Sequence, residues 1–165
     1  MAESRSRTFS WTDPGETIAG LVELPGLEAL RRTITGELPH PPIAALIGMR
    51  IVEAEEGRVV WEALPGEEHY NPIGTVHAGF ATTLLDSAMG TAFVSLAEAG
   101  TRWTTLELKA NFTRAITAET GPVRCVGMVL NRGRTVVLTE ARLEDAEGRL
   151  LAHATSTILV LGERS

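Results

Sequence analysis

The fold is decided by one stretch, Asn71-Pro-Ile-Gly-Thr-Val-His77-Ala-Gly79-Phe-Ala-Thr-Thr-Leu-Leu-Asp86-Ser-Ala-Met-Gly90. From Ala81 to Leu96, apolar residues recur at the spacing of one face of an α-helix. The opposite side of this helix carries small or hydroxyl residues where a surface helix would carry charges, which is typical of a helix buried on most sides. The sequence therefore predicts a tight loop over residues 71–77, followed by a long buried helix that begins at Ala78 and ends near Gly100.

Asp86 is the only ionisable side chain between residues 78 and 97. A carboxylate that is partly removed from water is usually paired or used in chemistry. Gly79 and Gly90 lie near it on a helical wheel, which leaves room for a ligand or another backbone. Asp86 is therefore a candidate catalytic group. The alternative is a buried carboxylate held by hydroxyls such as that of Thr82.

The composition is that of a globular protein whose net charge does not favour binding to polyanions. The chain has 165 residues, 44% of them hydrophobic and 22% charged, which indicates one domain with a full core. Its net charge of −6 argues against nucleic acid and anionic membranes as partners, because both select basic surfaces. A local basic pocket for a phosphate remains compatible with that charge.

Features linked to location point to the cytoplasm. Cys125 is the only cysteine and lies in an apolar run, so it is interpreted as a small core residue in a reducing compartment. No apolar segment typical of a secretory signal follows Met1–Arg7. No uninterrupted apolar run approaches the roughly 20 residues that a membrane-spanning helix needs.

Two parts of the chain are distinguished. Residues 1–40 form an N-terminal extension in which 1–22 are polar and 24–36 form one short amphipathic helix. The main domain covers residues 41–165 and begins with a possible short helix over 42–48. This extension is expected to attach to the main domain without a core of its own.

Alternating apolar and polar residues predict the strands. Two of them, joined by a turn at Glu56-Gly57, precede the long helix, and four follow it with tight connections. Short connections imply antiparallel pairing. One apolar helix with one antiparallel sheet gives an α+β fold whose sheet curls around the helix. The expected strands are 49–53, 58–63, 104–113, 124–130, 135–143 and 150–161.

This order of elements, with Asn-x-x-Gly-x-x-His-x-Gly ahead of Asp86, resembles the hot-dog fold acyl-CoA thioesterases of the phenylacetic-acid-degradation (PaaI-like) family. The resemblance spans roughly 41–161 and includes the segments Thr104–Arg114 and His153–Thr157. It departs at Ala78, where the family usually has glycine, although alanine supplies the same backbone N–H. The resemblance implies a coenzyme A thioester as substrate. It also implies a homodimer with active sites between subunits, commonly paired into a homotetramer, and a tunnel for the acyl chain beside the long helix.

The resemblance also assigns catalytic roles. Asp86 would act as general base or as nucleophile, facing donors contributed by the other chain. The backbone N–H of Ala78, with that of Gly79, would form the oxyanion hole at the start of the helix. The hydroxyl that supports the carboxylate would be that of Thr105, or of Thr104 if the strand register shifts by one residue. No metal or cofactor is expected.

Asn71 and His77 are the polar anchors of the loop. Asn71 would position the water or the thioester. His77 would orient the loop or bind the substrate carbonyl; alternatively, it only ties the loop to a backbone carbonyl.

Three arginines and four apolar residues are candidates for substrate binding. Arg114, Arg132 and Arg134 could bind the phosphates of coenzyme A, since guanidinium groups match phosphate oxygens, or could simply be solvated. The apolar candidates could line a pocket for an aromatic or medium-chain acyl group, or could belong to the core; they are Phe80, Met89, Phe93 and Trp103.

Two other functions stay open. The first is an acyl-thioester hydratase or dehydratase, in which His77 would be the second acid–base group. The second is a non-catalytic acyl-CoA-binding protein. The sequence has no His-Glu-x-x-His motif and no Gly-x-Ser-x-Gly elbow, so neither a zinc site nor an α/β-hydrolase serine is indicated.

Overall fold

The computed structural model describes residues 4–163, so residues 1–3 of the segment examined for a signal peptide lie outside the described residues. Six strands form one antiparallel sheet in the order β1-β2-β4-β5-β6-β3. The strands are β1 (Met49–Glu55), β2 (Arg58–Ala63), β3 (Thr101–Phe112), β4 (Val123–Arg132), β5 (Val136–Glu144) and β6 (Leu150–Glu163). The helices are α1 (Pro14–Glu23), α2 (Gly26–Thr35), α3 (Pro42–Ile47) and α4 (Ala78–Val94), with single 3-10 turns at Glu67–His69 and Ala118–Thr120.

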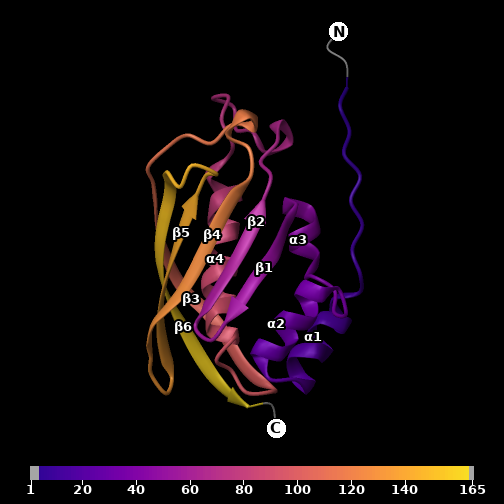
Figure 1. Cartoon of the computed structure of the whole chain (residues 1–165), viewed down its shortest axis with the longest axis vertical. Coiled ribbons are helices and arrows are strands. Elements are labelled where there is room, and N and C mark those ends of the chain that lie inside the picture. Colours follow the sequence, from indigo (N-terminus) through magenta and orange to yellow (C-terminus); the bar gives the residue numbers. More distant parts are fainter. Residues whose placement is uncertain (1–3, 164–165) are drawn as a thin grey trace.

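The long helix α4 lies against the concave face of the sheet, as the α+β prediction requires (Figure 1). Its residues Leu84, Leu85, Ala88 and Met89 are fully buried. The backbone of α4 approaches β4 closely because Gly127 has no side chain: a Cβ there would lie 2.2 Å from the Ala88 carbonyl oxygen. The predicted fold class is confirmed.

The helix ends at Val94, earlier than the expected end near Gly100. The hydroxyl of Ser95 donates to the Ala92 carbonyl at 2.7 Å and accepts the Gly57 N–H at 2.8 Å. These bonds tie the end of α4 to the β1–β2 turn, so the chain turns here. The following strand β3 begins at Thr101, before its expected start at Thr104.

The N-terminal extension contains a helix that the sequence analysis did not predict. Asp13 accepts the Gly15 N–H at 2.8 Å, and Pro14 occupies the first turn, so α1 has both an N-cap and a favoured first residue. The expected helix α2 ends at Gly36, whose φ of 82° is left-handed. The short helix α3 is present as expected. Figure 1 shows α1, α2 and α3 grouped beyond β1.

The two edges of the sheet differ. Helices α2 and α3 pack on β1, whereas β3 is the other edge strand and, within residues 4–163, has β6 as its one neighbouring strand. A long uncovered edge strand presents backbone groups for pairing with another chain. No helix within residues 4–163 is both long and apolar enough to span a bilayer.

Candidate active site

Asn71 builds the loop that precedes α4. Its side-chain oxygen accepts the N–H groups of Ile73 at 3.0 Å and Thr75 at 3.2 Å, and its amide donates to the Thr75 hydroxyl at 2.9 Å. Gly74 has a φ of 85°, which favours glycine at this turn. Most of the polar capacity of Asn71 is therefore used to shape the loop, and one amide hydrogen remains for another partner.

His77 caps the N-terminus of α4. Its Nδ1 atom accepts the Gly79 N–H at 2.8 Å. An accepting Nδ1 places the proton of the neutral ring on Nε2, so the exposed Nε2–H is a donor. The ring therefore lacks a free acceptor and is a poor general base in this position. The alternative in which His77 only ties the loop to a backbone carbonyl is not what the structure shows, because the ring bonds a backbone N–H instead.

The same bond distinguishes the two expected oxyanion donors, because it occupies one of them. The Gly79 N–H is already used by His77, so this part of the prediction does not fit the geometry. The Ala78 N–H has no hydrogen-bond partner within the described residues and lies at the positive end of α4. It is the donor that remains for a developing oxyanion.

A cavity of about 310 Å³ opens beside this loop and the start of α4. Its second wall is the segment 112–116, joined to the loop by the Val76 N–H, which donates to the Ile116 carbonyl at 2.8 Å. The cavity brings together three of the predicted site residues and one predicted arginine: Asn71, His77, Ala78 and Arg114.

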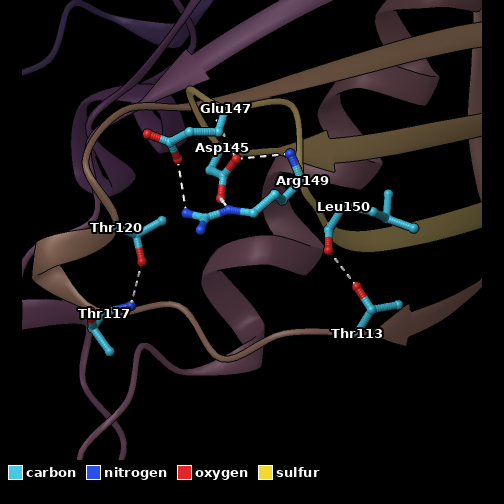
Figure 2. Close-up of polar contacts among 7 residues, drawn as sticks. All are labelled: Thr113, Thr117, Thr120, Asp145, Glu147, Arg149 and Leu150. Carbon is cyan, nitrogen blue, oxygen red and sulfur yellow. Dashed lines mark hydrogen bonds and ion pairs between the residues drawn. The ribbon is translucent and has the colours of Figure 1, made fainter.

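Figure 2 shows the polar contacts that hold this second wall and the neighbouring β5–β6 turn. The Thr113 hydroxyl donates to the Leu150 carbonyl at 2.7 Å. In the turn, one Asp145 oxygen accepts the backbone N–H groups of Arg149 at 2.9 Å and Glu147 at 3.1 Å, and the other accepts Arg149 Nε at 2.6 Å. Although desolvation raises it, the pKa of Asp145 is lowered overall, because these bonds and the Arg149 charge favour the carboxylate.

Asp86 lies on α4 and points toward β3. Its Oδ1 atom accepts the Thr105 hydroxyl at 3.0 Å. Thr105 is half-buried, whereas Thr104 is exposed on the other side of the strand, as alternation requires. The Thr82 hydroxyl donates to its own helix at the Ala78 carbonyl, so it does not hold Asp86. Thr105 is therefore the hydroxyl that supports the carboxylate.

A second cavity, of about 270 Å³, reaches Asp86. Asp86 is half-buried, and its Oδ2 atom has no hydrogen-bond partner among residues 4–163. The rest of the wall is mainly apolar and includes Leu21, Leu30, Leu38, Trp61 and Trp103. A carboxylate with one supported and one free oxygen thus borders an apolar space.

The two cavities hold different halves of the predicted machinery. Ala78 and Asp86 are eight residues apart on one helix, which corresponds to about 12 Å along its axis. A single carbonyl carbon cannot be within reach of both groups of one chain. Within one chain, the predicted site residues are not brought together at one point.

The remaining predicted residues lie elsewhere. Phe80 is buried in the core, with its ring centroid 4.7 Å from that of His69, and lines neither cavity. Arg132 lies beside the C-terminal end of α4 in a surface depression with Glu98. Arg134 is exposed in the β4–β5 turn. These two arginines are therefore at the end of α4 opposite to Arg114.

Sequence reasoning missed Trp61 and the α1–α2 residues as walls of the Asp86 cavity. These residues come from separate segments of the chain. Taken one at a time, each apolar residue indicates only a place in the hydrophobic core. Among residues 4–163, no group of three or more His, Cys, Asp or Glu is arranged to hold a metal ion.

Comparisons with known proteins agree on one family. The thioesterase superfamily model matches residues 73–152. Human acyl-coenzyme A thioesterase 13 is 32% identical over 133 residues, which cover 79% of this chain and 93% of the human protein.

Two solved structures are similar. A phenylacetic acid degradation-related protein from Ralstonia eutropha is 28% identical with a TM-score of 0.72, and the match covers 79% of this chain and 98% of that one. A hypothetical thioesterase with coenzyme A from Streptococcus pneumoniae is 28% identical with a TM-score of 0.63, over 71% of this chain and 88% of that one.

Proposed function

This chain belongs to the thioesterase superfamily and is a thioester hydrolase, and from that premise we propose that it hydrolyses aromatic or medium-chain acyl-CoA esters with Asp86 as the general base. The hot-dog fold and the PaaI-like resemblance named from the sequence are confirmed. The coenzyme A in the Streptococcus pneumoniae structure supports the proposal that coenzyme A is the leaving group of the reaction. The observation that carries the proposal is the supported carboxylate of Asp86 at an apolar cavity.

The proposed reaction needs no group beyond the chain and water. The free oxygen of Asp86 takes a proton from water, and the resulting hydroxide attacks the thioester carbonyl carbon. The Ala78 N–H donates to the oxygen as it becomes negative, which is typically worth about 3 kcal/mol in the transition state. The C–S bond then breaks, and the thiolate of coenzyme A receives the proton from Asp86.

The proposed site is shared by two chains, because Ala78 and Asp86 of one helix are too far apart for one carbonyl. Pairing of β3 with the β3 of a second copy would join the two sheets and bring the loop of one chain to Asp86 of the other. The uncovered edge and the exposed Leu106 and Phe112 on β3 support this homodimer.

The proposed second level of assembly is a dimer of dimers. The sheet face that points away from α4 carries a group of exposed apolar side chains on β4 and β5, which supports burial against another dimer. Its members are Met128, Leu130, Val136 and Leu138.

A cytoplasmic location is also proposed, since the single cysteine, Cys125, is buried and desolvation raises its pKa, as expected for an inert thiol.

Arg114 is the proposed contact for a coenzyme A phosphate, because it lines the cavity that holds Asn71 and Ala78. Arg132 and Arg134 would reach the same ligand only from the partner chain. Phe80 is no longer proposed for substrate binding because it is buried in the core.

The two alternatives have less support. A hydratase or dehydratase needs a second acid–base group, and the acceptor atom of His77 is already bonded to Gly79. A pure binding protein would not need the free oxygen of Asp86 beside an apolar cavity.

Release of free thiol from a panel of acyl-CoA esters tests the proposal. We expect turnover by the wild type and a loss of about 10²–10⁴-fold in Asp86→Asn, the range for removal of a positioned base. Glu55→Gln, at an exposed carboxylate at the end of β1, is the matched control and should retain full activity. Near-normal turnover in Asp86→Asn would exclude Asp86 as the base.

A further inference from the structure

One wall of the Asp86 cavity lies outside the region matched by the family model. The helical cap, defined as residues 14–41, contains α1, α2 and the segment up to Pro41, and all of it precedes residue 73. From the cap, Leu21 of α1, Ala29 of α2 and Leu38 line the cavity. The cap therefore closes a space whose opposite wall is built by β2, β3 and α4.

That opposite wall is rigid. The Trp61 indole N–H donates to the Thr91 hydroxyl at 2.9 Å, which fixes the ring against α4. The Trp103 ring lies directly on Gly90, where a Cβ would be 2.9 Å from the ring, and it packs edge-on against Phe93 at 6.0 Å. Two fixed aromatic rings leave little room for the cavity to widen on this side.

The cap is fastened to the rest of the chain at three places. The Gly26 N–H donates to the Ala97 carbonyl at 2.9 Å, and the Gly100 N–H donates to the Leu21 carbonyl at 3.2 Å. His40 accepts the Ile51 N–H at 3.1 Å. These bonds hold both walls at a set separation, so the cavity has a defined size.

The size and lining of the cavity indicate what fits. A cavity of about 150 Å³ holds a benzene molecule, whereas this one is about 270 Å³. It can therefore take one aromatic ring with a short linker, or a straight chain of comparable volume. Its carboxylate, that of Asp86, lies on α4, so a ligand would place its polar end there and its apolar end against the cap.

We propose that the helical cap sets the acyl specificity of this enzyme by limiting the depth of the Asp86 cavity. The proposal rests on the function proposed above. Arylacetyl and medium straight-chain groups fit between the cap and the two tryptophans, while longer chains are excluded by the side chains of α1 and α2. The cap residues are specificity determinants and take no part in the chemical step.

Three cap variants test this. Ala29→Leu adds bulk to the cavity, and Leu38→Ala removes bulk from a half-buried wall position. Ile34→Ala, at an exposed position of α2, is the matched control. Each is assayed by thiol release from acetyl-, hexanoyl-, phenylacetyl- and lauroyl-CoA.

Ala29→Leu should lower kcat/KM for phenylacetyl-CoA by about tenfold or more while that for acetyl-CoA changes by less than about threefold. Leu38→Ala should raise kcat/KM for lauroyl-CoA relative to kcat/KM for hexanoyl-CoA. Ile34→Ala should have the acyl preference of the wild type. An unchanged acyl preference in both Ala29→Leu and Leu38→Ala would overturn the proposal.

A binding measurement separates this proposal from the catalytic one. Toluene, an uncharged arene, should change the fluorescence emission of Trp61 and Trp103 saturably in a Trp11→Phe background, and Ala29→Leu should abolish that change. If no acyl-CoA is hydrolysed but toluene binds as expected, the catalytic assignment fails while the cavity remains. If thioesters are hydrolysed and toluene binds equally well in Ala29→Leu, the role of the cap is refuted.

Discussion

The backbone N–H of Ala78 can be deleted without unwinding α4. Ala78 is the first helical residue, a position where proline is favoured because its missing N–H has no partner within the helix. His77, which would precede the proline, already has the extended backbone that this requires, with ψ of 139°. We expect Ala78→Pro to lower kcat by about 10²–10³-fold through loss of one oxyanion donor.

The control for this change is Ala78→Gly, which retains the N–H and should stay within about threefold of wild-type kcat. Thermal unfolding of the proline variant should resemble that of the wild type. Full activity in a folded Ala78→Pro protein would show that the oxyanion donor lies elsewhere.

His40 gives the fold a pH dependence. Burial, together with the nearby Arg50 charge, lowers its pKa below the ordinary value of 6.5, and its Nε2 atom must be neutral to accept the Ile51 N–H. Between the folded and unfolded pKa values the unfolded chain binds more protons. The contribution of His40 to stability is therefore complete above about pH 6.5 and is lost as the pH falls through the lowered pKa.

His40→Gln retains an acceptor near the position of Nε2 but does not titrate. We expect its free energy of unfolding to fall less than that of the wild type between about pH 7.5 and pH 5, measured by urea denaturation. Some loss should persist, because burial lowers the pKa of His69 in the same direction. An equal loss in both proteins would contradict this role of His40.

At the scale of elements, the contact between α4 and β4 depends on one missing side chain. Gly127→Ala would place a methyl group 2.2 Å from the Ala88 carbonyl oxygen, so the helix or the strand must move. We expect a loss of about 1–3 kcal/mol in the free energy of unfolding, measured by chemical denaturation. In the matched Gly15→Ala variant the new methyl group meets only the Asp13 side chain, at 3.2 Å, and stability should change little.

Elements were predictable from sequence where their periodicity is local. The spacing of apolar residues predicted α4, and alternation predicted the strands and placed Thr105 opposite to Thr104. The helix α1 was missed because its segment is mainly polar, and its N-cap at Asp13 is a short signal. The resemblance implied an acyl tunnel beside the long helix, and Trp103 was a candidate for its wall. The other walls of the Asp86 cavity could not be predicted, since they come from separate parts of the chain that only the folded sheet brings together.

At the scale of the whole molecule, a shared site predicts complementation between inactive chains. Asp86→Asn and Ala78→Pro subunits are each expected to be inactive alone. In a mixed dimer, one site carries both changes and the other carries none. Equal co-expression should therefore restore about a quarter of the wild-type sites, since about half of the dimers are mixed.

Thiol release from co-purified, differently tagged subunits measures this restoration. Mixing Asp86→Asn with Asp86→Asn is the control and should stay inactive. Activity in the mixed dimer that never exceeds the sum of the two inactive proteins would show that each site is built from one chain.

The open edge of β3 has a consequence for a chain that has not yet formed the proposed homodimer. A newly made chain exposes the unpaired edge of a twelve-residue strand, whose outward backbone groups could pair with unrelated strands. Glu107 and Lys109, which follow the bulge in that row, place opposite charges along it. Such charges deter indiscriminate aggregation and tolerate a neighbour only in a register that matches them. They would protect the newly synthesised monomer from non-specific strand pairing until a second subunit binds.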